Sequence, residues 1–255
     1  MDTFHKTASA AAIATEVASL RWLEVAGGAP VARVVADGRT WLETAYLPSV
    51  APTATAARTF GGLLAHTHAA GASHWGQVPP GLDPADSRLA ELVQPAAAGS
   101  SSWGEWFAAN RVAPYVKLAR DRGALGHEES RAVDRAIAAL ARGKWDAPLP
   151  GLCTAPAARI HGDLWGGNVL WTAHGATLID PAAHGGHAET DLAELAVFHT
   201  PYLDQILAGY HAASPLADGW RERIPVHQLH MLAVHVALFG TAYSGELVRL
   251  ARLAS

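Results

Sequence analysis

The sequence predicts a mixed α/β fold, with a small α/β part over residues 1–46 and a larger, mainly helical part over residues 47–255. Three observations lead to this prediction. Alanine-rich stretches with apolar residues at helical spacing recur along the chain. Two short β-like runs flank the pair Asp37-Gly38, which is typical of a hairpin turn. A glycine-rich stretch over residues 161–191, with short apolar runs between its turns, interrupts the helical part.

The expected elements can be placed in chain order. Residues 9–24 predict a helix that stops at Gly27-Gly28, and residues 32–36 and 40–46 predict the two strands of the hairpin. The Pro-rich segment 47–53 is the best candidate for a domain boundary. Further helical segments are expected at residues 55–70, 85–94, 101–122 and 127–142, and from residue 191 to the end. The remaining stretch, from Ala158 to Asp180, predicts short strands separated by a loop and a turn.

The composition excludes several classes of protein. Half of the 255 residues are apolar and only 16% are charged, which excludes a disordered chain. With a net charge of −4, the chain has no basic surface for nucleic acid or anionic lipid. The single cysteine, Cys153, excludes an internal disulfide and a cysteine-rich zinc site. Because there is no signal peptide and no long apolar run, we expect a soluble, cytoplasmic protein without a membrane partner.

Chemistry-bearing residues are concentrated in HGDLWGGNVL, residues 161–170, and in LIDP, residues 178–181. Asn168 and Asp180 flank a predicted hairpin, which can return their side chains to one place. Such oxygen ligands suit magnesium. Asp163 could accept a proton from an attacking hydroxyl group, as the aspartate of a kinase catalytic loop does. Taken singly, each of these residues would be read as a turn former.

The ordered run HGDLWGGNVLW…LIDPAAHGGHAETDLAEL resembles the catalytic core of the fructosamine (ketosamine) kinase family, relatives of the aminoglycoside phosphotransferases and choline kinases. The resemblance continues through residues 103–123 and 215–240. It implies a two-lobed, protein-kinase-like fold with an N-lobe over residues 1–46 and a helical C-lobe over residues 47–255. It also implies ATP and Mg²⁺ as cofactors, and a glycated amine as the small-molecule substrate.

The resemblance assigns a role to each candidate residue of the catalytic loop. It makes Asp163 the catalytic base, with His161 bracing the loop, and it makes Asn168 and Asp180 the magnesium ligands. Asp191 is expected to cap the following helix and to bind the loop backbone. The candidate substrate contacts are Trp165, His187 and Glu189.

The nucleotide site is also assigned by the resemblance. Lys6 corresponds to the phosphate-binding lysine, and Glu16 to the glutamate that pairs with it. That one of only three lysines falls here supports this alignment. The hinge that offers backbone groups to adenine is expected at Glu43, Thr44, Ala45 and Tyr46.

One feature departs from the family pattern. Only five residues precede Lys6, and no glycine-rich phosphate loop occurs in the sequence. The N-lobe is therefore expected to be short and truncated, with an activity impaired by the missing N-terminal strands. Three functions remain open: a ketosamine kinase, a kinase of an aminoglycoside or choline-type acceptor, and a pseudokinase that acts as an interaction module. A zinc site at His184 and His187 is disfavoured, because no third soft ligand follows.

Overall fold

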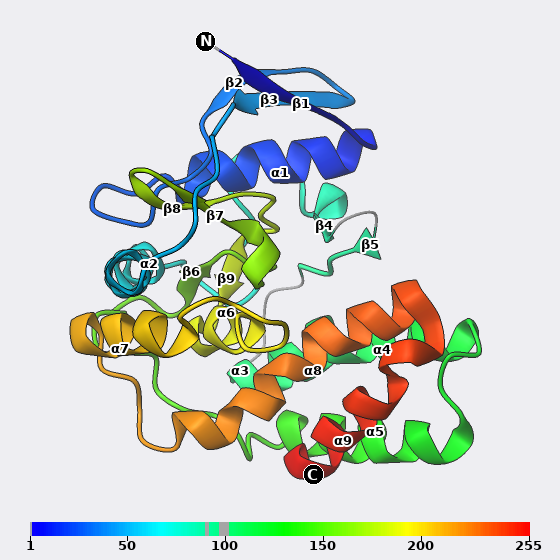
Figure 1. The fold of residues 1–255 in the computed structure, drawn as a ribbon. Coiled ribbons are helices and arrows are strands. Elements are labelled where there is room, and N and C mark those ends of the chain that lie inside the picture. Colours follow the sequence, from blue (N-terminus) through cyan, green and yellow to red (C-terminus); the bar gives the residue numbers. More distant parts are fainter. Residues whose placement is uncertain (1, 90–91, 97–101) are drawn as a thin grey trace. The chain divides into compact units, whose positions relative to one another are not determined.

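The computed structural model describes residues 2–89, 92–96 and 102–255 (Figure 1). The chain forms two compact units. The first unit comprises Met1–Ala96 and Leu149–Ala217, and the second comprises Ala97–Pro148 and Asp218–Ser255. The lobe boundary expected at residue 46 falls inside the first unit and stays a prediction.

The first unit begins with an antiparallel sheet packed on a helix (Figure 1). In spatial order its strands are β1 (Thr3–Thr7), β3 (Trp41–Ala45) and β2 (Val34–Asp37). Helix α1 (Ala10–Leu23) begins after Ser9, whose hydroxyl accepts a hydrogen bond from the N–H of Ala12. Ile13, Val17 and Leu20 of α1 pack with Leu42 of β3 in one buried cluster. This burial fixes α1 against the sheet and so positions the side chains that both elements carry.

The rest of the first unit combines helices with short strand pairs. The hairpin β7–β8 turns between Thr172 and Gly175, so the hairpin predicted between Asn168 and Asp180 is present. The pairs β6–β9 and β4–β5 are also antiparallel. These elements are α2 (Ala54–Ala69), η1 (Pro84–Asp86), β4 (Arg88–Leu89), β5 (Leu92–Val93), β6 (Ala158–Ile160), η3 (Gly166–Asn168), β7 (Val169–Thr172), β8 (Gly175–Leu178), β9 (His184–Gly186), α6 (Ala188–Glu194) and α7 (Leu203–Ala213).

Helices α2 and α7 approach each other closely through two glycines. A Cβ atom built on Gly61 of α2 would lie 1.9 Å from the carbonyl oxygen of Ile206, and one on Gly209 of α7 would lie 1.9 Å from that of Arg58. Both distances are far inside van der Waals contact, so only glycine fits at either position. The same two helices carry His68 and Tyr210, which form a hydrogen bond beneath the catalytic loop.

The helix predicted over residues 85–94 is wrong. The described part of this segment holds the 3₁₀ turn η1 and the short strands β4 and β5, and residues 90–91 lie outside the described residues. The Thr15 side chain of α1 explains the difference. Its hydroxyl lies 2.9 Å from the carbonyl oxygen of Asp86 and accepts the N–H of Arg88 at 3.1 Å. These contacts engage backbone groups that a helix would pair internally.

The described part of the second unit is helical. The helix predicted over residues 101–122 is present from Trp103, while residue 101 lies outside the described residues. It contains one π-helical segment that ends at Val112, two residues before Pro114, which has no N–H to donate. The elements are α3 (Trp103–Phe107), η2 (Ala108–Val112), α4 (Ala113–Asp121), α5 (His127–Ala141), α8 (Trp220–Phe239), η4 (Gly240–Tyr243) and α9 (Ser244–Ala254).

The run Trp220–Ala254 is long and apolar enough to cross a membrane by length and composition alone. Half of its most apolar window is buried inside the structure, as in the core helix of a globular protein. Within this run, the sequence offers residues 231–243 as its best apolar stretch, and that stretch is short and interrupted by His235.

Candidate active site

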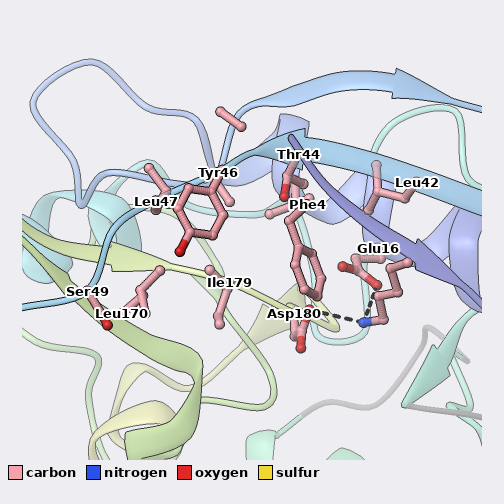
Figure 2. A pocket seen from close by; sticks show the side chains of 14 residues that line it. Phe4, Glu16, Leu42, Thr44, Tyr46, Leu47, Ser49, Leu170, Ile179 and Asp180 are labelled. Carbon is pink, nitrogen blue, oxygen red and sulfur yellow. Dashed lines mark hydrogen bonds and ion pairs between the residues drawn. The ribbon is translucent and has the colours of Figure 1, made fainter. Parts of the chain in front are cut away.

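Lys6 links the sheet, helix α1 and the segment after β8. Its Nζ atom lies 2.7 Å from Oε2 of Glu16 and 3.0 Å from Oδ1 of Asp180. Figure 2 shows these two interactions as dashed lines. Residues 6 and 16 meet because β1 lies on α1, and residue 180 reaches them because the β7–β8 hairpin returns the chain. The structure therefore brings together three residues that the resemblance singled out.

The two acidic partners of Lys6 raise its pKa. Burial alone would lower the pKa of Lys6, but the carboxylates of Glu16 and Asp180 outweigh burial and hold this pKa above its ordinary value. Lys6 is therefore charged at neutral pH. Burial also raises the pKa of Glu16, and the attraction of Lys6 opposes that increase. A cation fixed between two acids is well placed to bind phosphate oxygens.

Asp163 and Asn168 lie five residues apart in the catalytic loop, which begins at His161, and they contact each other. The Asn168 amide Nδ2 donates to the Asp163 backbone oxygen at 2.8 Å and to its carboxylate Oδ2 at 3.1 Å. This arrangement leaves the amide oxygen of Asn168 without a partner among the described residues. Burial raises the pKa of Asp163 to about 7, although the Asn168 amide opposes the increase. A carboxyl group with such a pKa can exchange a proton near neutral pH.

Asp180 has a left-handed backbone conformation with φ of 52°. This conformation is uncommon for residues other than glycine, but aspartate and asparagine tolerate it. The neighbouring Ile179 donates its N–H to the backbone oxygen of Asn168 at 3.1 Å. Asn168 and Asp180 are thus held side by side at the base of the hairpin, and both line the cavity that contains Asp163.

The fully buried Asp191 fixes the start of the catalytic loop. Its carboxylate accepts the backbone N–H of His161 at 2.7 Å and that of Gly162 at 3.0 Å. The expected contact with the loop backbone is therefore present. Asp191 is not the helix cap, however. His187 holds that position, and its Nδ1 accepts the N–H of Glu189.

Two buried residues that the sequence did not indicate support Asp191. His68 Nε2 lies 3.0 Å from the Asp191 carboxylate, and its Nδ1 lies 2.9 Å from the Tyr210 hydroxyl. Burial alone would raise the pKa of Asp191, but the hydrogen bond from His68 and the loop N–H groups hold it below its ordinary value. Asp191 is therefore ionised and accepts a hydrogen bond from His68 Nε2, while His68 Nδ1 pairs with the Tyr210 hydroxyl.

Two further side chains complete the bracing of the loop. His161 Nδ1 accepts the N–H of Asp163 at 3.3 Å, and Nε2 lies 3.0 Å from the backbone oxygen of Ile179. Burial lowers the pKa of His161, so the ring is neutral and braces the loop without carrying charge. Glu194, which sequence reasoning missed, accepts the N–H of Leu164 at 2.9 Å. Its spacing of three residues from Asp191 on one helix face was the available signal.

A cavity of about 330 Å³ opens beside Lys6, between the sheet and the β7–β8 hairpin (Figure 2). Its walls are mainly apolar, with the rings of Phe4 and Tyr46 on the sheet side and Leu170 and Ile179 on the hairpin side. A volume and lining of this kind suit a flat aromatic ligand group.

The predicted hinge residues only partly line this cavity. Thr44, Ala45 and Tyr46 do so, whereas the Glu43 side chain lies 3.3 Å from the ring of His5. The N–H groups of Ala45 and Tyr46 already bind backbone oxygens of the chain. The N–H of Leu47, by contrast, has no partner among the described residues, and Leu47 lines the cavity.

A second cavity, of about 370 Å³, lies on the other side of Lys6. It shares Lys6, Glu16 and Asp180 with the first cavity and adds the catalytic loop. The residues that line only this second cavity are Ala8, Ala12, Thr15, Arg88, Leu89, Asp163, Trp165, Asn168, Pro181 and Ala182.

The three predicted substrate contacts have different surroundings. Trp165 lines the second cavity, is 38% exposed and packs edge-on against Phe198. His187 and Glu189 are buried at the start of α6, where His187 stacks on Trp75. Among the described residues that line the two cavities, neither His187 nor Glu189 occurs. Their role in substrate binding stays a prediction.

Comparison with known proteins identifies the family. A model of the fructosamine kinase family matches residues 3–253. The chain belongs to the fructosamine kinase family. A probable ketoamine kinase of Klebsiella aerogenes is 33% identical over 202 residues, which are 79% of this chain and 64% of that protein. A ketosamine-3-kinase of Mus musculus is 32% identical over 155 residues, which are 59% of this chain and 46% of that protein.

Solved structures agree with this family and define the fold. A fructosamine-3-kinase of Thermobifida fusca, described as putative, has a TM-score of 0.84 and 44% identity, over 94% of this chain and 78% of that one. The aminoglycoside phosphotransferase APH(2'')-Ib has a TM-score of 0.56 at 11% identity, over 98% of this chain and 87% of that one, and shows the shared protein-kinase-like fold. The resemblance noted in the sequence is confirmed. The match to the Klebsiella relative spans less than two thirds of that protein's length.

Proposed function

We propose that this protein transfers the γ-phosphoryl group of ATP to a sugar hydroxyl of a ketosamine, a glycated amine of the fructosamine type. The observation that carries the proposal is the convergence of Lys6, Asp163, Asn168 and Asp180 around one junction between two cavities. The family supplies the class of acceptor. We place the enzyme in the cytoplasm and expect neither nucleic acid nor a membrane as its partner.

The first cavity would hold the nucleotide base. Phe4, Tyr46, Leu170 and Ile179 provide apolar surfaces for the ring system, and the free N–H of Leu47 can donate a hydrogen bond to a ring nitrogen. Lys6 would then contact the phosphates, since it lies where the two cavities meet. The ion pair with Glu16 fixes the side chain of Lys6 before the nucleotide arrives, which reduces the ordering cost of binding.

The donor set at the loop fits Mg²⁺. The Asn168 amide oxygen and the Asp180 carboxylate are hard oxygen ligands, and the Asn168 amide is already oriented by its bonds to Asp163. When bound, Mg²⁺ would neutralise charge on the phosphate oxygens. Asn168 and Asp180 are the residues that would hold it.

Asp163 would act on the acceptor. Its carboxylate orients the sugar hydroxyl and takes its proton as the hydroxyl oxygen bonds to the γ-phosphorus. The bond between that phosphorus and the β–γ bridging oxygen breaks, and ADP leaves with the bridging oxygen. Asp191, Glu194 and His161 keep the loop backbone fixed during transfer, so the enzyme acts mainly by positioning.

An acceptor panel tests this function. With Mg²⁺-ATP, we expect ADP release only in the presence of a glucose-derived ketosamine of the fructosamine type, and not with fructose, the parent amine, choline or an aminoglycoside. Mass spectrometry should show one added phosphoryl group on the ketosamine. Release of ADP with an aminoglycoside or choline alone would assign the enzyme to a different acceptor class. Binding of ATP without transfer to any acceptor would support an interaction module instead.

A further inference from the structure

The second cavity contains a cation that the proposed function does not use. Arg88 of β4 lines this cavity together with Asp163 and Trp165. Arg88 is half-buried. Its backbone N–H contacts Thr15 of α1, and the next residue of α1 is Glu16, which pairs with Lys6. An arginine in a catalytic cavity needs either a structural or a ligand-binding explanation.

The backbone around Arg88 holds its side chain in place. The N–H of Arg88 donates to Thr15 Oγ1 at 3.1 Å, and its Nη1 donates to the backbone oxygens of Ala85 at 2.8 Å and Ser87 at 2.9 Å. These bonds use Nη1 only. The Nε and Nη2 atoms have no partner among the described residues. Their N–H groups point along one edge of the guanidinium, and this edge binds both oxygens of a carboxylate.

The charges that line the cavity indicate which kind of ligand group this edge of the guanidinium binds. Three carboxylates line the cavity, from Glu16, Asp163 and Asp180, and Lys6 already contacts two of them. An anionic group that entered beside Asp163 would therefore be repelled by charges that Lys6 does not offset. Among the described lining residues, Arg88 is the one other cation.

Arg88 lies in the cavity proposed for the acceptor and not in the cavity proposed for the nucleotide base. Arg88 and Asp163 line the second cavity but not the first, whereas Lys6 lines both. A ligand group that contacts Arg88 thus lies on the same side of Lys6 as the carboxylate that would orient the acceptor hydroxyl.

We propose that Arg88 binds a carboxylate of the acceptor, so that the preferred substrates are ketosamines formed from α-amino acids. This inference rests on the proposed function and names its substrate class more narrowly. The two oxygens of the acceptor carboxylate receive hydrogen bonds from Nε and Nη2 of Arg88, while its sugar hydroxyl faces Asp163. Arg88 is a specificity residue in this account and takes no part in proton transfer.

Two acceptors that differ only in charge test the inference. These are the ketosamine formed from glucose and glycine, and the corresponding ketosamine of glycinamide. For the wild-type enzyme we expect kcat/KM to be about tenfold or more higher for the glycine compound. In Arg88→Gln this preference should disappear through a higher KM for the glycine compound, with kcat and the KM for ATP close to wild type. Arg88→Lys keeps the charge and should restore part of the preference.

Arg39→Gln is the matched control, because Arg39 is an exposed arginine outside both cavities, and it should leave the preference unchanged. Equal kcat/KM values of the wild type for the two acceptors would overturn the inference alone. A loss of kcat on both acceptors in Arg88→Gln would also overturn it, and would place Arg88 on the transferred phosphoryl group.

A binding measurement keeps the inference testable if no transfer occurs. Calorimetric titration of the two ketosamines into the wild-type protein should show tighter binding of the glycine compound, and Arg88→Gln should abolish the difference. Absence of transfer with retention of this difference would refute the proposed function but not the carboxylate site. Absence of any difference in binding would refute the carboxylate site.

Discussion

At the scale of single residues, Asp163 decides whether the site can perform phosphoryl transfer. Its carboxyl group is partly buried, contacts Asn168 and has a pKa that desolvation raises to about 7. A buried carboxylate costs stability when ionised, yet a proton acceptor must be ionised to work. The ionised Asp163 carboxylate therefore destabilises the fold, but it lies where phosphoryl transfer needs a proton acceptor.

Replacement of Asp163 by asparagine separates these two effects. We expect Asp163→Asn to lower kcat by about 10²–10⁴-fold, since the amide cannot accept the hydroxyl proton, while ATP binding is retained. The same variant should unfold at a higher temperature than wild type at pH 8, because no buried charge forms. Below about pH 4 the carboxyl is protonated in both states, so the difference should vanish. Steady-state kinetics and thermal unfolding at the two pH values measure both effects. A variant with near wild-type kcat would show that Asp163 is not the base.

The raised pKa of Asp163 also predicts a pH profile. The activity requires the ionised carboxylate, so kcat/KM should fall about tenfold per pH unit on the acidic side. Burial places the start of this fall near pH 7 in the free protein, and bound Mg²⁺ would move it to lower pH. The residual activity of Asp163→Asn should show no such acidic limb. A wild-type profile with the same pH dependence as that of Asp163→Asn would contradict the assignment.

Asp180 offers a test of the metal site that preserves the backbone. Asparagine tolerates the left-handed conformation at φ of 52°, so Asp180→Asn removes the charge without backbone strain. We expect the Mg²⁺ concentration needed for half-maximal activity to rise by about tenfold or more, because one anionic ligand is lost. Asp204→Asn on α7, outside the two cavities, is the control for loss of one acidic charge. An unchanged Mg²⁺ requirement would remove Asp180 from the metal site.

The sequence indicated some site residues and not others for a physical reason. The loop residues Asp163, Asn168 and Asp180 stand in a local, ordered pattern, and the resemblance made that pattern interpretable. His68 and Tyr210 act through contacts across 142 residues of chain. The sequence around His68 and around Tyr210 contains no motif that indicates a partner so far away in the chain. Arg88 was missed because its segment was predicted to be helical.

At the scale of elements, the catalytic loop depends on the packing of α2 on α7. Gly61 and Gly209 allow these helices to approach, and His68 and Tyr210 then connect the helix pair to Asp191. The two helices were predictable from their apolar spacing. Their close approach was not, because a glycine within a helix pattern gives no indication of what packs against it.

Two adjacent glycines of α2 provide a matched comparison. A methyl group on Gly61 would collide with the backbone of α7, so Gly61→Ala should destabilise the protein by about 1–3 kcal/mol and lower kcat by displacing His68. A methyl group on Gly62 meets nothing closer than 3.9 Å. Gly62→Ala should therefore stabilise the helix by about 0.5–1 kcal/mol and leave kcat unchanged. Chemical denaturation and kinetics of both variants measure this. Equal stability of the two variants would show that the helices tolerate separation.

The segment over residues 85–94 shows how tertiary contacts override a local pattern. Its polar and apolar spacing favours a helix, and Pro84 stands at a typical first helical position. Thr15 and the β4–β5 pairing nevertheless use backbone groups of this segment. That competition places Arg88 in the second cavity, and a single sequence does not contain the information to foresee it.

At the scale of the whole molecule, the fold class was predictable because the resemblance extends over most of the chain. The family match covers residues 3–253, and the kinase-like fold agrees with it. Composition and spacing alone predicted only a mixed α/β chain with a β-containing insert. The division into compact units was not foreseen, because residues 1–96 and 149–217 join into one unit across a long stretch of sequence.

The central claim is that the junction between the two cavities transfers phosphate from ATP to a ketosamine hydroxyl. The most direct test is ³¹P NMR of a reaction that contains the protein, Mg²⁺-ATP and a glucose-derived ketosamine of the fructosamine type. We predict that the γ-phosphorus signal of ATP declines while signals of ADP and of a phosphomonoester bonded to a ketosamine carbon grow, and that Asp163→Asn shows neither change. Growth of inorganic phosphate alone, or a phosphomonoester formed equally by Asp163→Asn, would contradict the claim.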